Sequence, residues 1–205
     1  MPSPTELEQQ LRAIRPRRGA PAHTRERLIA AAAHLFNRVG FRGTDSNRIA
    51  RRAGYSPGVF YKHFKDKREI FLVVYERWVA SEWKAAALHV ESKNEKAVIV
   101  RRLVENVIEF HTKWKGLRAS LIALVYTDPQ IRRFYRDQRR RQLNVLARLR
   151  EEIGAHRHNR EDDAVLLYTL ERTCDAIANH ELGDLELRRA AFITILEERV
   201  AAALT

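Results

Sequence analysis

The chain has 205 residues, of which 45% are hydrophobic and 31% are charged, and this balance favours a globular protein over a disordered one. No stretch approaches the ~20 apolar residues that a membrane-spanning helix needs, and the N-terminal residues lack the apolar core of a signal peptide. We therefore expect a soluble, cytoplasmic protein with no membrane partner. The single cysteine, Cys174, excludes an intramolecular disulfide and a cysteine-rich zinc site. We expect it to be a small buried hydrophobic residue rather than a redox sensor.

The formal net charge of +12 is concentrated in the first part of the chain. Residues 1–87 contain 17 Lys and Arg against 8 Asp and Glu, a net +9. Residues 88–205 contain 21 against 18, a net +3. A positive surface attracts the phosphate backbone of nucleic acids whatever their base sequence. The charge therefore indicates the N-terminal part as the one that attracts nucleic acid.

Residues 1–22 are predicted to be a basic, flexible arm, because prolines punctuate the segment and Arg15, Arg17 and Arg18 form a cluster. Such an arm lies on DNA phosphates or in a minor groove, or it is a solvated tail. The first packed helix is predicted over residues 23–39. Its apolar side chains form one stripe, and Gly40 ends it.

Residues 44–67 have the pattern of two short helices joined by a tight turn. Thr44 or Asp45 caps the first helix, and Gly54 stops it. Ser56 is a candidate cap for the second helix, predicted over residues 57–64, which begins with Pro57. This arrangement is typical of a helix-turn-helix, whose second helix enters the major groove of DNA. The pattern alone also fits a helical corner with a solvated basic face.

The register of this region is carried by Gly40-Phe41, Gly43-Thr44, Ile49-Ala50, Ala53-Gly54, Ser56-Pro57-Gly58, Phe60-Tyr61, His63-Phe64 and Lys67. Together these residues resemble the signature of the tetracycline-repressor (TetR) family over residues 24–71. The resemblance implies an all-α fold with an N-terminal three-helix helix-turn-helix DNA-binding domain at residues 23–71. It also implies a C-terminal helical ligand-binding and dimerisation domain at residues 72–205.

The resemblance implies DNA contact at ten positions. Tyr61 and His63 match positions that meet phosphates, as does the basic Lys67 at the start of the next helix. Lys62 matches a position that approaches bases, and its ammonium group can reach guanine acceptors. Asp45 departs from the family, which more often has Thr or Ser near this position. Its negative charge disfavours a close contact with a DNA phosphate. The full set is Thr44, Asn47, Arg48, Pro57, Gly58, Val59, Tyr61, Lys62, His63 and Lys67.

The rest of the chain is predicted to be helical. Asp66 caps a helix that runs to about residue 88, and four or five more helices follow, with breaks at Gly116 and Gly154 and a last helix capped by Asp184. Aromatic side chains on successive helices either line a cavity for an apolar or amphipathic small-molecule effector or form plain core. The candidate effector residues, including two polar groups, are Trp78, Phe110, His111, Trp114, Tyr126, Phe134, Tyr168 and Arg172.

One predicted helix, over residues 129–153, carries a dense positive face with Arg132, Arg133, Arg136, Arg139, Arg140 and Arg141. A solvated face is the ordinary interpretation, although crowded like charges destabilise a helix unless they are neutralised. An anionic ligand such as an acyl-coenzyme A, or acidic groups on a neighbouring helix, would neutralise them. His156 and His158 flank Arg157 in the predicted loop after this helix, and we expect solvated histidines and no metal site.

The last two predicted helices are more apolar than one buried stripe requires, and by resemblance they form the interface of a homodimer. The chain has no nucleophile motif, glycine-rich phosphate loop or zinc-binding helix motif, so we expect neither an enzyme nor a cofactor. The sequence therefore predicts a ligand-responsive transcription regulator. The expected form is a repressor that binds a palindromic DNA operator and is released by its effector. Two alternatives are a nonspecific DNA-binding protein and a regulator controlled by protein contact without a ligand.

Overall fold

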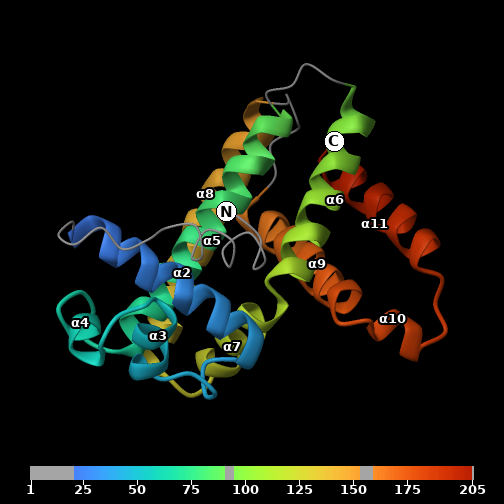
Figure 1. The fold of residues 1–205 in the computed structure, drawn as a ribbon. Helices are drawn as coiled ribbons and strands as arrows, with labels where there is room; N and C mark the ends of the chain where they lie inside the picture. The colour runs from blue at the N-terminus through green and yellow to red at the C-terminus, as the bar shows by residue number, and fades with distance from the viewer. Residues whose placement is uncertain (1–20, 91–94, 153–158, 205) are drawn as a thin grey trace. The chain divides into compact units, whose positions relative to one another are not determined.

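The computed structural model describes residues 21–90, 95–152 and 159–204. Within these residues the chain forms ten α-helices and no strand, as the all-α prediction requires (Figure 1). The helices are α2 (Pro21–Val39), α3 (Ser46–Arg52), α4 (Pro57–Tyr61), α5 (Lys67–Val90), α6 (Lys96–Lys113), α7 (Lys115–Val125), α8 (Pro129–Glu152), α9 (Arg160–Ala178), α10 (Glu181–Asp184) and α11 (Arg189–Ala203). The predicted arm lies outside the described residues except at positions 21 and 22, which begin α2. Among the described helices, none is both long and apolar enough to cross a membrane.

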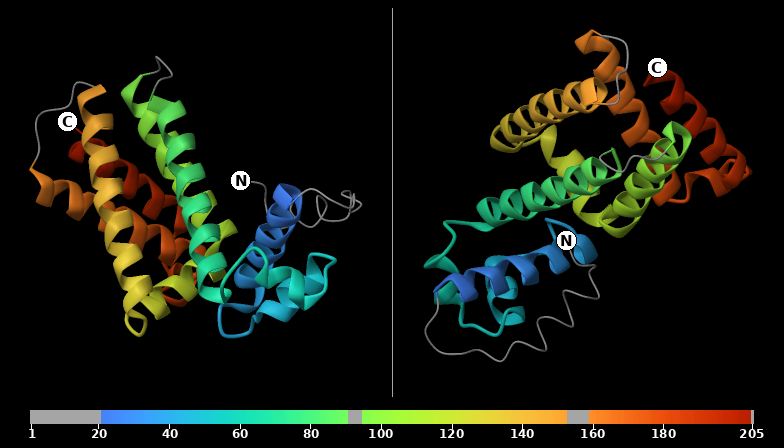
Figure 2. Two further views of the ribbon diagram at one scale, coloured as in Figure 1. Left: turned by 90° about the vertical axis from the view of Figure 1, so that its left-hand side faces the viewer. Right: turned by 90° about the horizontal axis from the view of Figure 1, so that it is seen from above.

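The chain divides into two compact units that do not follow sequence order. Unit 1 contains residues 1–80 and 116–132, and unit 2 contains residues 81–115 and 133–205. The division falls inside α5 and α8, each of which is drawn in Figure 2 as one unbroken helix. Each unit has its own buried core.

The core of unit 1 is built on the apolar face of α2. Phe36 lies 5.1 Å from the ring of Phe71 on α5 and 5.8 Å from Phe41, which follows the helix. At the surface, Arg77 of α5 donates two hydrogen bonds to the Glu26 carboxylate of α2, at 2.5 and 2.7 Å. These bonds hold the pKa of Glu26 below its usual range. An aromatic cluster and an ion pair thus join α2 to α5.

Helix α7 docks on the end of α2 through the side chain of Asn37. Asn37 Oδ1 accepts the backbone N–H groups of Gly116 and Leu117, at 3.1 and 3.2 Å, in the first turn of α7. The N–H of Phe41 donates to Ser120 Oγ at 3.0 Å. A Cβ atom on Gly116 would lie 1.9 Å from the carbonyl oxygen of Asn37, so the position has room only for glycine.

The predicted break at Gly116 is therefore wrong. Helix α6 ends at Lys113, and Gly116 lies inside α7. The glycine is needed for close approach of α2, and the helix boundary is set two residues earlier at Trp114, whose φ of −113° leaves the helical range.

The core of unit 2 is formed by α6, α9, α10 and α11. Its members are Val100, Val104, Val107, Ile108, Cys174, Ile177, Leu182, Leu196, Val200 and Leu204. Cys174 is fully buried, which confirms the prediction of a small buried hydrophobic residue. The last helix begins at Arg189, and Asp184 instead ends the short α10, so its prediction as the cap of the last helix is wrong.

Candidate nucleic-acid interface

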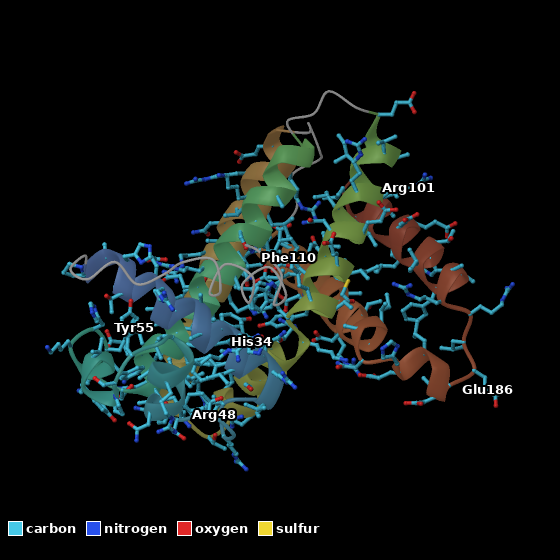
Figure 3. The ribbon with its side chains drawn as sticks, in the orientation of Figure 1. His34, Arg48, Tyr55, Arg101, Phe110 and Glu186 are labelled. Carbon is cyan, nitrogen blue, oxygen red and sulfur yellow. The ribbon has the colours of Figure 1, made fainter. Side chains whose placement is uncertain are left out.

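Helix α3 begins at a cap formed by Asp45, one of the two caps predicted. Its carboxylate accepts the N–H of Arg48 at 2.7 Å, and its backbone is extended. Arg48 and Asn47 are exposed, and the Arg48 guanidinium donates to the carbonyl of Gly43 at 2.8 Å. Figure 3 labels Arg48 together with Tyr55, which follows α3 in the turn. The hydrogen bond holds the Arg48 side chain beside the start of α3.

The turn after α3 is fixed by a residue that the sequence analysis did not single out. Arg27 of α2 is 7% exposed, and its Nε donates to the carbonyl of Ala53 at 3.0 Å. Its guanidinium also lies over the ring of Tyr55, 5.6 Å from the centroid. Gly54 takes the left-handed conformation, with φ of +83°, as expected for a helix stop. The sequence signal that could have identified Arg27 is its position directly before Leu28, at the edge of the apolar stripe of α2.

Helix α4 is anchored by Phe60 and presents its other residues outward. Phe60 is fully buried, whereas Tyr61 is 59% exposed and Pro57, Gly58 and Lys62 are also exposed. Ser56 is at the predicted cap position, but its side chain makes no capping hydrogen bond. The helix ends at Tyr61 rather than at the predicted residue 64. The N–H of His63 bonds to the carbonyl three residues back, which tightens the last turn.

Gly58 is required neither by backbone conformation nor by packing. A Cβ atom on it would meet no atom within 4 Å, and its φ is not in the left-handed range. Glycine in a helix costs roughly 1 kcal/mol relative to alanine. Folding therefore does not explain the glycine at this exposed position. A binding partner that approaches α4 closely would explain it, because glycine has no side chain to obstruct the approach.

Two predicted contact residues make contacts within the protein. Thr44 is 2% exposed, and its hydroxyl donates to the carbonyl of Gly40 at 2.9 Å. Lys67 Nζ donates to the carbonyls of Phe41 and Thr44, both at 2.8 Å, and lies 4.1 Å from the centroid of the Phe41 ring. Burial lowers the pKa of Lys67, and the charge of Asp45 opposes this shift. Both side chains close the junction of α2, α3 and α5, so neither belongs to the surface proposed below.

Residues 28–74, which contain this helix-turn-helix, match the family described as "Bacterial regulatory proteins, tetR family". The helix-turn-helix unit is that of the tetR family. This match confirms the resemblance seen in the sequence.

Similarity to relatives of known name covers more residues than this unit contains. The HTH-type transcriptional repressor AcnR of Corynebacterium efficiens is 26% identical over 117 residues, which are 57% of this chain and 58% of that repressor. The HTH-type transcriptional regulator AcrR of Shigella flexneri is 31% identical over 107 residues, 50% of this chain and 48% of that regulator. The chain thus spans about half the length of these relatives. A TetR-family transcriptional regulator from Streptomyces coelicolor shares the fold, with a TM-score of 0.68 at 16% identity, over 89% of this chain and 95% of that one.

The predicted effector residues are divided between the two units. Trp78 and Tyr126 belong to unit 1, and the other six belong to unit 2: Phe110, His111, Trp114, Phe134, Tyr168 and Arg172. Tyr126 is 74% exposed, and Arg172 pairs at the surface with Glu181 at 2.6 Å. Neither has the buried position expected of a pocket residue. Tyr168 is also more than half exposed, whereas Trp78, His111 and Trp114 are buried.

The interior of unit 2 contains titratable side chains that meet on one face of α9. Nδ1 of His111 lies 2.9 Å from a carboxylate oxygen of Asp175, and Nε2 lies 3.7 Å from Glu82. One turn earlier on α9, Glu171 accepts both terminal nitrogens of the buried Arg139 on α8. Arg139 is thus neutralised by an acidic group on a neighbouring helix, one of the alternatives considered for the arginine-rich helix. His156 and His158 lie outside the described residues, and within those residues no cluster suited to a metal ion is found.

Proposed function

We propose that the protein is a transcription regulator, a repressor that binds a palindromic DNA operator as a homodimer and is released from it by a small-molecule effector. The observation that carries the proposal is the outward face of α4 in a tetR-family helix-turn-helix. The relatives named as a repressor and a regulator support the same class.

The proposed DNA-contact surface consists of the exposed and half-exposed residues of α3, α4 and the turn after α4. They are Asn47, Arg48, Pro57, Gly58, Val59, Tyr61, Lys62 and His63. In this assignment Tyr61 and His63 meet phosphates, which fix position, and Lys62 meets a base edge, which carries sequence information. The open space beside Gly58 lets the backbone of α4 approach the groove floor.

Exposed apolar side chains in unit 2 support the homodimer. Val165 on α9, Leu185 and Leu187 before α11, and Ile195 on α11 are between 47% and 67% exposed. Large apolar side chains gathered on neighbouring elements favour a protein partner, and a second copy of this chain would bury the same residues twice. Two copies would also present two α4 helices, because one helix reads too few base pairs for specificity.

We assign the effector to unit 2, around the buried residues His111 and Trp114 and the half-buried Phe110 and Phe134. The polar side chains of His111 and Asp175 support an effector with a polar group as well as an apolar body, since a plain core rarely holds such groups. If the protein binds DNA nonspecifically, it should show no preference for any base sequence. If it is controlled by protein contact, it should have no small-molecule effector.

Selection from a random duplex library tests the proposal. The expected result is enrichment of an inverted repeat with half-sites ~34–36 Å apart, bound by two chains. Lys62→Ala should then relax preference at one base pair, at a cost of ~1–3 kcal/mol, while Tyr61→Phe weakens all sequences alike. Absence of any enriched sequence would favour the nonspecific alternative, and a monomer on a single half-site would overturn the dimer.

A further inference from the structure

Helix α8 carries an arginine excess that the helix-turn-helix does not explain. Its 24 residues include eight Arg and no Lys, against Asp137, Glu151 and Glu152, which gives eight minus three, a net +5. Arginine rather than lysine is the cation whose planar fork matches two oxygens of a phosphate or carboxylate. The composition of α8 therefore points to recognition of an oxyanion.

Internal contacts account for some of these arginines. Arg139 is neutralised by Glu171, and Arg150 Nε lies 2.6 Å from Asp163. Arg132 donates to the backbone carbonyls of Val125 and Tyr126. None of these three is available as a free cation on the surface.

The other five arginines of α8 are exposed. Four of them share one side of the helix, and we call Arg133, Arg136, Arg140 and Arg148 the arginine row. The fifth, Arg141, interacts with another part of the protein. Arg136 and Arg140 are 59% and 63% exposed, and they share one carboxylate, Asp137, at 3.9 and 3.5 Å. Arg133 and Arg148 have no ion-pair partner among the described residues. Exposed pairs at such distances are weak, so the row remains strongly positive.

We propose that the arginine row binds the phosphate backbone of duplex DNA, independently of base sequence, as a second contact surface besides α4. Arg133, Arg136 and Arg140 follow one another at three and four residues, the spacing of neighbours on a helix, at roughly 5–6 Å. Arg148 lies about two turns further along the helix. From Arg133 to Arg148 the row runs about 22 Å along the axis, at about 1.5 Å per residue. Forked donors along one side of a helix can meet several phosphates of one backbone, and the resulting attraction carries no base preference.

The surroundings of the row favour DNA over an acidic protein. Protein interfaces depend on buried aromatic or aliphatic anchors, and the described side chains of α8 include no exposed large apolar residue. A small anion would instead need donors that converge from several elements, whereas these four lie along one helix. The proposal rests on DNA as the partner of the chain, but it does not depend on the contacts assigned to α4.

Fluorescence anisotropy with a scrambled duplex of about 30 base pairs tests the row, in salt from about 50 to 200 mM. The full chain is compared with the triple variant Arg133→Gln, Arg136→Gln, Arg140→Gln. The slope of log K against log salt should fall in magnitude by about 2 to 3, since each lost phosphate contact removes about 0.9. The control Arg101→Gln, Arg102→Gln, Arg160→Gln removes the same charge from exposed positions of unit 2 and should change the slope much less.

Equal slopes for the two triple variants would overturn the proposal, because the row would then act only through net charge. An unchanged slope in both would do the same, and would be the result if the row binds an acidic protein. The variant Tyr61→Ala, Lys62→Ala separates the two surfaces. If it binds the duplex like the unmodified chain while the row variant loses affinity, the function assigned to α4 fails and the row stands.

Proximity gives a second measurement that does not depend on affinity. Cys174 is fully buried, so a thiol introduced as Arg140→Cys is the accessible position for an iron chelate that cleaves nearby DNA. Cleavage of the duplex from this position, and not from Arg101→Cys, is expected. Cleavage from both positions alike, or from neither, would contradict a contact at the row.

Discussion

Gly58 separates the demands of folding from those of DNA binding, because its missing side chain faces open space. We expect Gly58→Ala to raise the free energy of unfolding by ~0.5–1 kcal/mol, since alanine restricts the unfolded chain and favours the helix. The same methyl group should weaken DNA binding by occupying the approach to the groove. Urea unfolding and anisotropy on one preparation measure both effects.

Gly183 of α10 provides the matched control for this change. A Cβ atom there also meets nothing within 4 Å, and the residue lies far along the chain from α4. Gly183→Ala should stabilise the protein similarly and leave DNA affinity unchanged. A Gly58→Ala variant that binds DNA as tightly as the Gly183→Ala variant would remove Gly58 from the contact surface.

Lys67 should behave as a structural residue. Lys67→Met retains the aliphatic stem but leaves the carbonyls of Phe41 and Thr44 without their donor. We expect a loss of ~1–3 kcal/mol in unfolding free energy. The salt slope of DNA binding should not change, because the ammonium faces carbonyls rather than phosphates. A slope smaller by ~1, without loss of stability, would instead restore Lys67 to the DNA contacts.

The roles of Thr44 and Lys67 show where residue-level prediction stops. The resemblance assigns a role by position in a motif, and it placed Asn47, Arg48, Tyr61 and Lys62 at positions that are exposed. Whether a side chain at such a position is free depends on partners distant in sequence. The ring and carbonyl of Phe41 lie 26 residues before Lys67, and no local pattern in the chain reports their approach.

Helix boundaries are likewise predictable where they depend on local sequence, and not where they depend on contacts distant in sequence. Asp45 and Asp66 each accept a backbone N–H in the turn that they begin, as the sequence analysis predicts. Asp128 does the same before α8. Helix α10 and the start of α11 were not predicted, because His180 and Glu186 adopt left-handed conformations that non-glycine residues seldom take. Packing of Leu182 into the core of unit 2 accompanies this bend.

Gly116 differs from Gly58 because the packing of two helices requires it to be glycine. Gly116→Ala would place a methyl group 1.9 Å from the carbonyl oxygen of Asn37, and a backbone atom cannot swing aside. We expect a loss of ~1–3 kcal/mol in stability, because α7 must move away from α2. Thermal unfolding measures the loss, with Gly183→Ala as the control. Unchanged stability would mean that the contact between α7 and α2 is not tight in solution.

At the scale of the whole molecule, the proposed function requires reciprocal coupling between effector and operator. An effector that releases the repressor must bind the DNA-free state more tightly, since equal affinity for both states shifts no equilibrium. Operator DNA should then weaken effector binding by the same factor, with a coupling of ~1–3 kcal/mol. Titration calorimetry with an effector found by thermal-shift screening, with and without operator, measures this factor. Equal affinities in the two titrations would exclude release by that ligand.

The interruption of unit 1 in sequence has a consequence for its synthesis. The helix-turn-helix is complete at residue 67, and the first segment of unit 1 ends at Ala80. The second segment, which contains α7, ends at residue 132, 52 residues beyond Ala80. At roughly 5–20 residues per second, a ribosome takes about 3–10 s to add them. During that interval α7 does not yet cover the end of α2. The side chain of Asn37 then lacks its hydrogen-bond donors, the backbone N–H groups of Gly116 and Leu117. A nascent chain stalled before residue 116 should therefore hold this end of α2 open to proteases, and one stalled well past residue 132 should protect it.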